Sequence, residues 1–287
     1  MKTLNALFML AIFSVVLFAG CATTRVSSSA MIRTMGIGES AVPIEKNSYA
    51  IELFNDKSTT IDVISATNPF DWQDLENIHA MSGGKVSHHC RHYGLNLRFG
   101  LKKHTEIKLG FLKGSITNGN EEINAIDEDG NYLIRKTKFN SDFVGGQFGI
   151  KHLLTDYANP GRISLYLDGK YFITYSDGLA WDYDGRTIEL KPALLFGYLK
   201  DPASRNFPSF SFYYSLANTN RDKTLRGIPA NKNSQAIGAE ANLNLAYGVM
   251  YTNLAFGVEK EIGNKATDEI RRYFGAKVGF HFKQKKN

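Results

Sequence analysis

The sequence predicts an all-β protein: an antiparallel up-and-down β-barrel of about ten strands that crosses a membrane. From about residue 48 onward, apolar and polar residues alternate with a period of two, as in strands with one apolar and one polar face. After residue 20 no apolar run has the length of a spanning helix, so a membrane crossing would have to use strands. The connections alternate between short and long, as in transmembrane barrels.

The clearest alternating segment is 93–100, where Tyr93, Leu95 and Phe99 lie on one face and Asn96 and Arg98 on the other. The same pattern recurs along the chain at 105–111, 144–151, 163–173, 188–198, 209–216, 237–247, 253–259 and 274–282. With a weaker candidate at 60–66 as the first strand, the count is about ten, and 8 or 12 strands are alternatives. The segment 49–54 is expected to be a strand before the barrel, or an eleventh strand.

The expected connections give the barrel its orientation. Those at 101–103, 155–161, 200–207 and 248–250 are short or tight, whereas those at 114–142, 176–186, 219–234 and 261–271 are longer. Short turns are typical of the periplasmic side. Both ends of the barrel are therefore expected on that side.

Alternation alone does not say which face points inward, because a soluble lipocalin-like barrel shows the same period with an apolar interior. Several segments reach the length that a tilted spanning strand needs. Tyrosines near strand ends resemble an interfacial girdle; they are Tyr93, Tyr175, Tyr198, Tyr213, Tyr214 and Tyr247. We therefore expect Leu243, Leu245, Phe280 and Phe282 to face lipid. The alternative is a lipid-anchored soluble β-barrel that binds an apolar ligand.

The N-terminus has the features of a secretory signal peptide over residues 1–20: Lys2, then an apolar run, then small residues. The sequence Leu17-Phe-Ala-Gly-Cys21 resembles the lipobox of bacterial lipoproteins. That resemblance implies cleavage before Cys21, acylation of its thiol and an anchor in the outer membrane; cleavage without a lipid stays open. Residues 21–47 are then a lipidated, flexible linker, and residues 48–287 one barrel domain.

The last strand carries a second resemblance. Its sequence from Tyr273 to Phe280 is similar to the terminal β-signal of outer-membrane proteins, with a glycine two residues after the first position and then spaced apolar residues. The expected location is therefore the outer membrane of the cell, and the expected partners are membrane lipids and a small solute.

The polar face of a ten-stranded barrel would line a narrow lumen. The expected lumen residues are Arg98, Glu106, Lys108, Lys151, Asp168, Lys170, Glu189, Lys191, Glu240, Glu259 and Lys277. Charges of both signs pair in a low-dielectric bore. We expect an ion-pair network, which could form either a plug or the wall of a pore.

One cluster has metal-ligand side chains: His88, His89, Cys90 and His92, a set that suits zinc or copper. Adjacent strand residues point to opposite sides, so only a loop could gather all four, and an exposed loop end is the simpler interpretation. The acidic segments 127–130 and 182–185 could hold calcium but are better explained as solvated turns.

No catalytic residue is predicted. Asp182 and Asp184 resemble the aspartate pair of omptin proteases, but the second pair of that family, Asp-x-His, is absent. No cofactor is expected. The formal charge of +6 comes without a Lys/Arg block, so nucleic acid is not an expected partner. The sequence favours a structural role, or binding and passage of a small solute.

Overall fold

A computed structural model of the chain describes Thr34 and residues 36–60, 64–65, 84–126, 132–176, 185–199, 206–221, 231–262 and 270–283. The expected signal peptide and Cys21 lie outside the described residues. The strands are β1 (Ser48–Thr60), β2 (Ile64–Ser65), β3 (Gly84–Lys102), β4 (Thr105–Ile126), β5 (Tyr132–Leu153), β6 (Gly161–Ser176), β7 (Gly185–Tyr198), β8 (Phe207–Arg221), β9 (Asn231–Tyr247), β10 (Met250–Ile262) and β11 (Ile270–Lys283). No helix of membrane-spanning length and apolarity occurs in this part of the chain.

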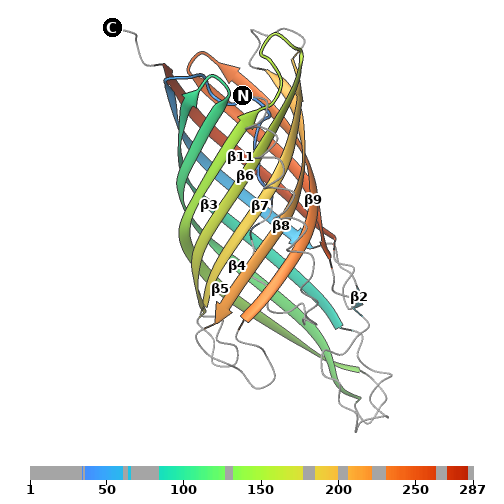
Figure 1. Ribbon diagram of the computed structural model, residues 1–287. Helices are drawn as coiled ribbons and strands as arrows, with labels where there is room; N and C mark the ends of the chain where they lie inside the picture. The colour runs from blue at the N-terminus through green and yellow to red at the C-terminus, as the bar shows by residue number, and fades with distance from the viewer. Residues whose placement is uncertain are drawn as a thin grey trace.

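The strands form one closed antiparallel barrel, with each long strand paired to its neighbours in the chain (Figure 1). Closure comes from β1, which pairs with β11 from Ser48↔Lys283 onward and with β3 from Tyr49↔Phe99 onward. Ten long strands therefore make the described wall, as predicted, whereas β2 pairs over two residues only.

The first strand of the barrel differs from the prediction. The segment 60–66 was expected to fill this place, but β1 begins at Ser48 and ends at Thr60. The segment 49–54, expected as a strand before the barrel or as an eleventh strand, is the first half of β1. The physical reason is closure, because β1 satisfies the backbone groups of both β11 and β3 and leaves no open sheet edge.

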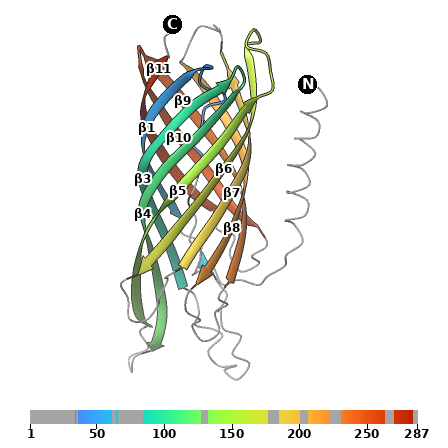
Figure 2. The same ribbon diagram turned by 60° about the vertical axis from the view of Figure 1, so that its left-hand side comes forward.

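The predicted long loop at 114–142 is also wrong. β4 and β5 stay paired as far as Ile126↔Tyr132 and form a long hairpin that extends beyond the rim (Figures 1 and 2). The opposite rim has the short connections between β3 and β4 and between β9 and β10. The first residue of β1 and the last of β11 lie at this short-turn end, as expected.

The two faces of the wall are sorted as a membrane barrel requires. Leu243, Leu245 and Phe280 are 43–44% exposed on the outside, and Phe282 is half-buried against Tyr49 with ring centroids 5.1 Å apart. The alternative with an enclosed apolar face therefore does not describe this barrel. Of the expected girdle tyrosines, Tyr213 instead points into the lumen, because its neighbour Tyr214 takes the other face of β8.

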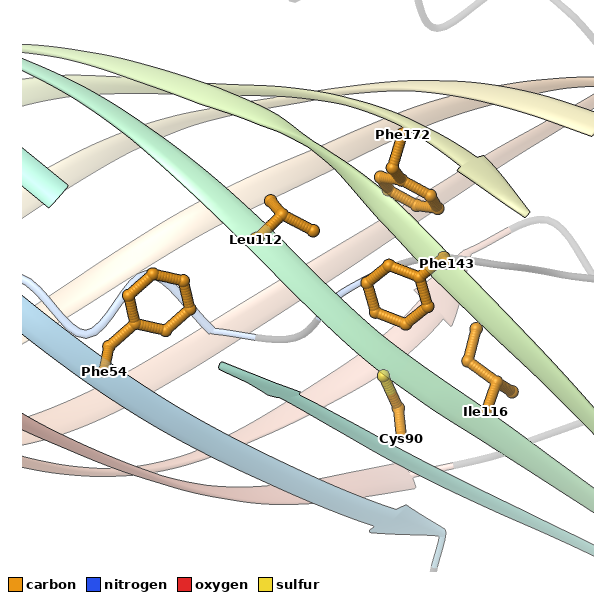
Figure 3. Close-up of a cluster of buried hydrophobic side chains, with 6 residues drawn as sticks. All are labelled: Phe54, Cys90, Leu112, Ile116, Phe143 and Phe172. Carbon is orange, nitrogen blue, oxygen red and sulfur yellow. The ribbon is translucent and has the colours of Figure 1, made fainter. Parts of the chain in front are cut away.

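One of the apolar clusters in the lumen is built from six residues of the wall alone. Side chains of β1, β3, β4, β5 and β6 meet in this cluster, which we call the apolar cluster (Figure 3). Its members are Phe54, Cys90, Leu112, Ile116, Phe143 and Phe172. Cys90 of β3 pairs with Ser58, which lies near the end of β1 that is far from Ser48. The cluster therefore occupies the half of the lumen nearer the long hairpin.

Candidate functional site

The lumen is occupied by the chain's own N-terminal region. This part of the chain consists of Thr34 and residues 36–47, and we call it the lumen segment. In chain order it runs from Thr34, inside the bore, to Asn47 at the short-turn rim. At the rim the backbone N–H of Asn47 donates to the carbonyl of Gly100 at 2.9 Å. Further in, Ser164 Oγ donates to the carbonyl of Ala41 at 2.6 Å. Residues 34–47 were expected to be part of a flexible linker; the structure instead places them among the polar side chains of the wall.

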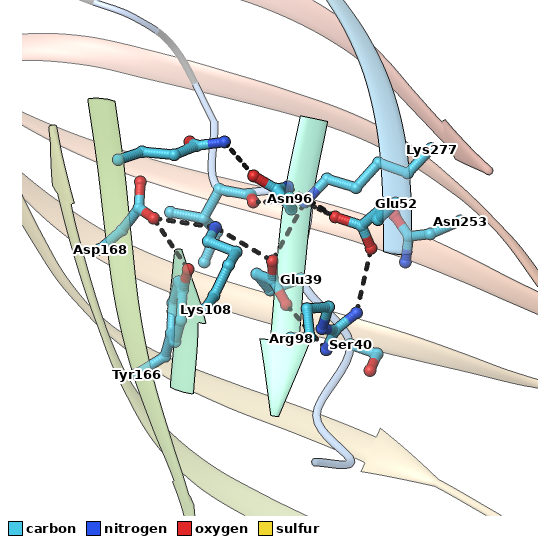
Figure 4. A network of polar contacts seen from close by, with 12 residues as sticks. Glu39, Ser40, Glu52, Asn96, Arg98, Lys108, Tyr166, Asp168, Asn253 and Lys277 are labelled. Carbon is cyan, nitrogen blue, oxygen red and sulfur yellow. Dashed lines mark hydrogen bonds and ion pairs between the residues drawn. The ribbon is translucent and has the colours of Figure 1, made fainter. Parts of the chain in front are cut away.

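Glu39 is the centre of this arrangement (Figure 4). Its Oε1 lies 3.2 Å from Lys108 Nζ and 3.1 Å from Lys277 Nζ. Its Oε2 lies 2.9 Å from Lys151 Nζ and 3.4 Å from Arg98 Nη2. These four cations, which we call the cation cage, come from β3, β4, β5 and β11. Both oxygens of one carboxylate are thus shared among four donors.

The charge balance favours an ionised Glu39. Burial alone would raise the pKa of its carboxyl group, but Lys151, Lys277, Arg98 and Lys108 outweigh burial and lower this pKa well below its ordinary value. Glu39 is therefore a full negative charge at neutral pH. A buried ion of this kind persists only where paired charges and hydrogen bonds replace water.

The wall supplies its own anions to the cage. Arg98 pairs with Glu52 at 3.1 Å and with Glu106 at 2.7 Å, and Lys108 Nζ lies 3.0 Å from Asp168. Three wall carboxylates therefore face four cage cations in this network. Glu39 supplies the fourth negative charge, so the lumen segment makes the cage neutral.

At a second contact, which we call the second anchor, the wall supplies the carboxylate and the segment supplies the donors. The wall carboxylate of Glu240 accepts the backbone N–H groups of Ile37 at 3.0 Å and Glu39 at 3.3 Å. The backbone turns there because Gly36 and Gly38 have positive φ angles of 68° and 55°, which glycine adopts without strain. Tyr273 donates a further hydrogen bond to Glu240.

Thr34 forms the innermost described anchor. Lys170 Nζ donates to Thr34 Oγ1 at 2.7 Å, and Lys191 Nζ donates to the Thr34 carbonyl at 2.7 Å. The Thr34 hydroxyl donates to Glu189 at 2.5 Å. The segment thus gives oxygen acceptors to lysines that lie deeper in the bore than the cage.

All eleven residues expected in the lumen are buried, with exposures from 0% to 6%. Most of them meet in the two ion networks just described. Arg98, Glu106, Lys108, Lys151 and Lys277 surround Glu39, whereas Asp168, Lys170, Glu189 and Lys191 extend from the cage to Thr34. Glu240 holds the backbone of the segment, and Glu259 accepts a hydrogen bond from Tyr213 at 3.1 Å.

The expected metal ligands are separated by the strand they occupy. His88, His89, Cys90 and His92 lie inside β3, not at the end of a loop. His89 is exposed, whereas Cys90 and His92 point into the lumen, and His92 Nε2 is 3.2 Å from Asp56 Oδ2. The side chain of His88 is outside what the structure describes. Among the described residues no group of three or more metal-binding side chains occurs.

The segments 127–130 and 182–185, expected to be acidic turns, lie outside the described residues, and so do Asp182 and Asp184 of the omptin-like pair.

The sequence interpretation missed Thr34, Glu39 and Glu52. Glu52 is the inward residue of β1 between Ile51 and Leu53, and it was overlooked because that strand was placed outside the barrel. Glu39 had a weaker signal: one acidic residue behind two glycines in a stretch without alternation.

No protein-family model matches the chain, and no curated protein matches it. Solved structures that resemble it include the translocator domain of autotransporter NalP from Neisseria meningitidis, with TM-score 0.44, 10% identity, and 83% of this chain and 90% of that chain covered. Another is the COG4313 outer membrane channel from Pseudomonas putida F1, with TM-score 0.45, 8% identity, and 87% and 100% coverage. The outer membrane protease OmpT from Escherichia coli gives TM-score 0.37, 9% identity, and 86% and 100% coverage. At these scores and identities none of the three assigns a role to this chain.

Proposed function

We propose that the protein is an outer-membrane β-barrel lipoprotein that binds and passes small solutes when the lumen segment leaves the bore. An apolar outer wall and short turns at one rim support the membrane location. The lipobox-like sequence before Cys21 supports an acyl anchor. With the segment in place the lumen is closed, because its backbone and Glu39 fill the centre of a narrow barrel.

The observation that carries the proposal is how the segment is held. Its polar contacts to the wall are hydrogen bonds and ion pairs, among them those of Glu39, Ile37 and Thr34. Its apolar side chains Ile37 and Ala41 pack in a cluster with wall residues, which are Tyr166, Ala193, Leu195 and Tyr213. The segment forms no strand with the wall before Ser48. The polar contacts can exchange for water, and the apolar contacts of Ile37 and Ala41 are not part of the strand pairing, so the segment can withdraw without breaking the barrel.

The test is conductance in planar lipid bilayers. We compare the full chain with a variant that lacks residues 34–46 but keeps Cys21 and all of the wall. The full chain should stay closed, and the deletion variant should conduct steadily. Heat-modifiable migration on a gel verifies that both barrels are folded.

A structural role is the second candidate, and the number of buried ion pairs around Glu39 favours it. In that case the segment is a permanent part of the core. A folded deletion variant that remains closed would support the structural role and contradict passage. The lipid anchor is tested separately: after Cys21→Ser, acyl labelling should disappear while the barrel stays in the carbonate-washed membrane pellet.

A further inference from the structure

We propose that the cation cage is a binding site for small carboxylate-bearing solutes, and that Glu39 occupies it as an internal substitute for such a solute. This inference rests on the proposed function, because a solute can enter only where the lumen segment yields its place. The site is Arg98, Lys108, Lys151 and Lys277, and the ligand atoms are the two oxygens of one carboxylate.

The first argument is that the site is already built for this group. Arg98, Lys108, Lys151 and Lys277 are 0–5% exposed, and each directs a charged nitrogen to within 2.9–3.4 Å of an oxygen of Glu39. Hydrogen bonds from charged donors to a carboxylate are stronger than those between neutral groups, and donors from four strands fix the orientation of a planar anion. The wall, not the segment, supplies all of these donors.

The second argument is the charge that remains when the segment leaves. The ion pairs around Glu39 and Thr34 join six wall cations, the cage with Lys170 and Lys191, to four wall carboxylates in the described part of the lumen. When Glu39 leaves, the four cage cations face only Glu52, Glu106 and Asp168, so the cage keeps one positive charge more than its wall carboxylates balance. An uncompensated excess in a narrow, low-dielectric bore attracts a small anion.

The third argument concerns the donors beyond the cage. Lys170 and Lys191 donate to the hydroxyl and carbonyl of Thr34. These oxygens leave together with Glu39, so a solute would meet a cage for one carboxylate and two more lysine donors deeper in the bore. A dicarboxylate such as succinate has an anionic group for each place.

Chemical rescue tests the site in the full chain. Glu39→Ala empties the cage, so the temperature at which the barrel loses its folded migration on a gel should fall. Acetate should restore that temperature, because its carboxylate fits the vacated place, whereas sodium chloride at equal ionic strength should not. The matched control is Glu45→Ala, which removes an exposed partner of Lys283 at the rim and should show no response to acetate.

Calorimetric titration with succinate gives a second readout that needs no conductance. The folded deletion variant should bind succinate and the full chain should not, and Lys151→Gln in the deletion variant should weaken binding at least about tenfold, as expected for loss of a buried charged donor. Lys103→Gln, an exposed lysine at the rim, is the control. A folded deletion variant that binds no succinate would overturn the inference, and so would a destabilised Glu39→Ala variant that acetate does not restore. A deletion variant that conducts but binds no succinate would overturn the carboxylate site alone, whereas one that binds but does not conduct would overturn passage alone.

Discussion

Among single residues, Glu39 contributes most to holding the lumen segment inside the bore. Glu39 belongs to no strand, yet it satisfies four cations of the wall. Removing one partner of a buried ion pair typically costs about 3–5 kcal/mol, since the remaining charges stay buried without compensation. The position of the segment therefore depends more on Glu39 than on its apolar residues Ile37 and Ala41.

Glu39→Gln should loosen the lumen segment by about 3–5 kcal/mol. Limited proteolysis checks this prediction, because cleavage between residues 34 and 47 should rise strongly in the folded variant. Ser40→Ala is the control, since its hydroxyl donates only to the nearby carbonyl of Val42. Equal protection of both variants would show that the backbone contacts alone hold the segment.

The pKa of Glu39 makes the closed state sensitive to acid. Its pKa in the docked segment lies below the value of about 4.3 expected for an exposed glutamate. The contribution of the ionised carboxylate to docking is therefore complete above about pH 4.3 and is lost as pH falls through the lower docked value. Glu52, Glu106 and Asp168 face the same cations and are the other carboxylates of this network.

We accordingly expect the full chain to stay closed from pH 7 to about pH 4.3 and to open only in stronger acid. Bilayer conductance recorded through a pH titration measures this. Glu39→Gln should lose the part of the transition that belongs to Glu39. A full chain that opens between pH 7 and 5 would contradict this assignment.

Gly257 in the wall lies directly against the ring of Tyr273, which belongs to the second anchor. A Cβ on Gly257 would lie inside the ring of Tyr273, whose hydroxyl donates to Glu240. Gly257→Ala should therefore displace Tyr273 and weaken the hold of Glu240 on Ile37. The expected cost is about 1–3 kcal/mol, typical of overpacking. Gly248→Ala, at a position with φ of 60° and open space around it, controls for backbone strain alone.

Among the structural elements, the turns at the short-turn rim are stabilised by hydrogen bonds between side chains and backbone groups. Arg162 at the start of β6 donates to the carbonyl of Asp156 at 2.7 Å and to those of Tyr157 and Asn159. The turn between β5 and β6 thus closes around one buried guanidinium. In the same turn, burial raises the pKa of Tyr157 to about 12.

Arg162→Ala should destabilise the barrel by about 2–5 kcal/mol, because it leaves the turn carbonyls without their charged donor. The urea concentration at which folded migration is lost measures the change. Lys103→Ala removes an exposed ion pair to Asp156 in the same turn region and should cost at most about 1 kcal/mol. Similar losses for both variants would mean that Arg162 acts only as a surface charge.

At the scale of the whole molecule, an apolar outside and a charged inside define a body that is stable in lipid. Phe210 and Phe256 both pair with Ala241, and Phe256 pairs with Phe274, so these phenylalanines lie at one level of the apolar outer face. They are 41–59% exposed. Arginine on the lipid face costs about 2–4 kcal/mol at the midplane and about 0–1 near the interface. The exposed face of this barrel should follow that gradient.

Phe256→Arg should therefore lower stability in liposomes by about 2–4 kcal/mol, and Tyr247→Arg, at the short-turn rim, by no more than about 1. Urea unfolding in liposomes gives both values. If the two substitutions cost the same, the outer face is not in contact with hydrocarbon, and the membrane location fails.

Residue order along the chain was enough to predict the alternation of the wall, eleven of the charged residues that point inward and the rim at which both barrel ends lie. These features follow from a local period of two and from loop lengths, and both can be read from consecutive residues. The closure of the barrel by β1, the strands within 114–142 and the place of Glu39 in the cation cage became known from the folded structure alone. The partners of β1 and of Glu39 are distant in the chain, so their pairing exists only once the wall has closed and its charges share one narrow, low-dielectric space.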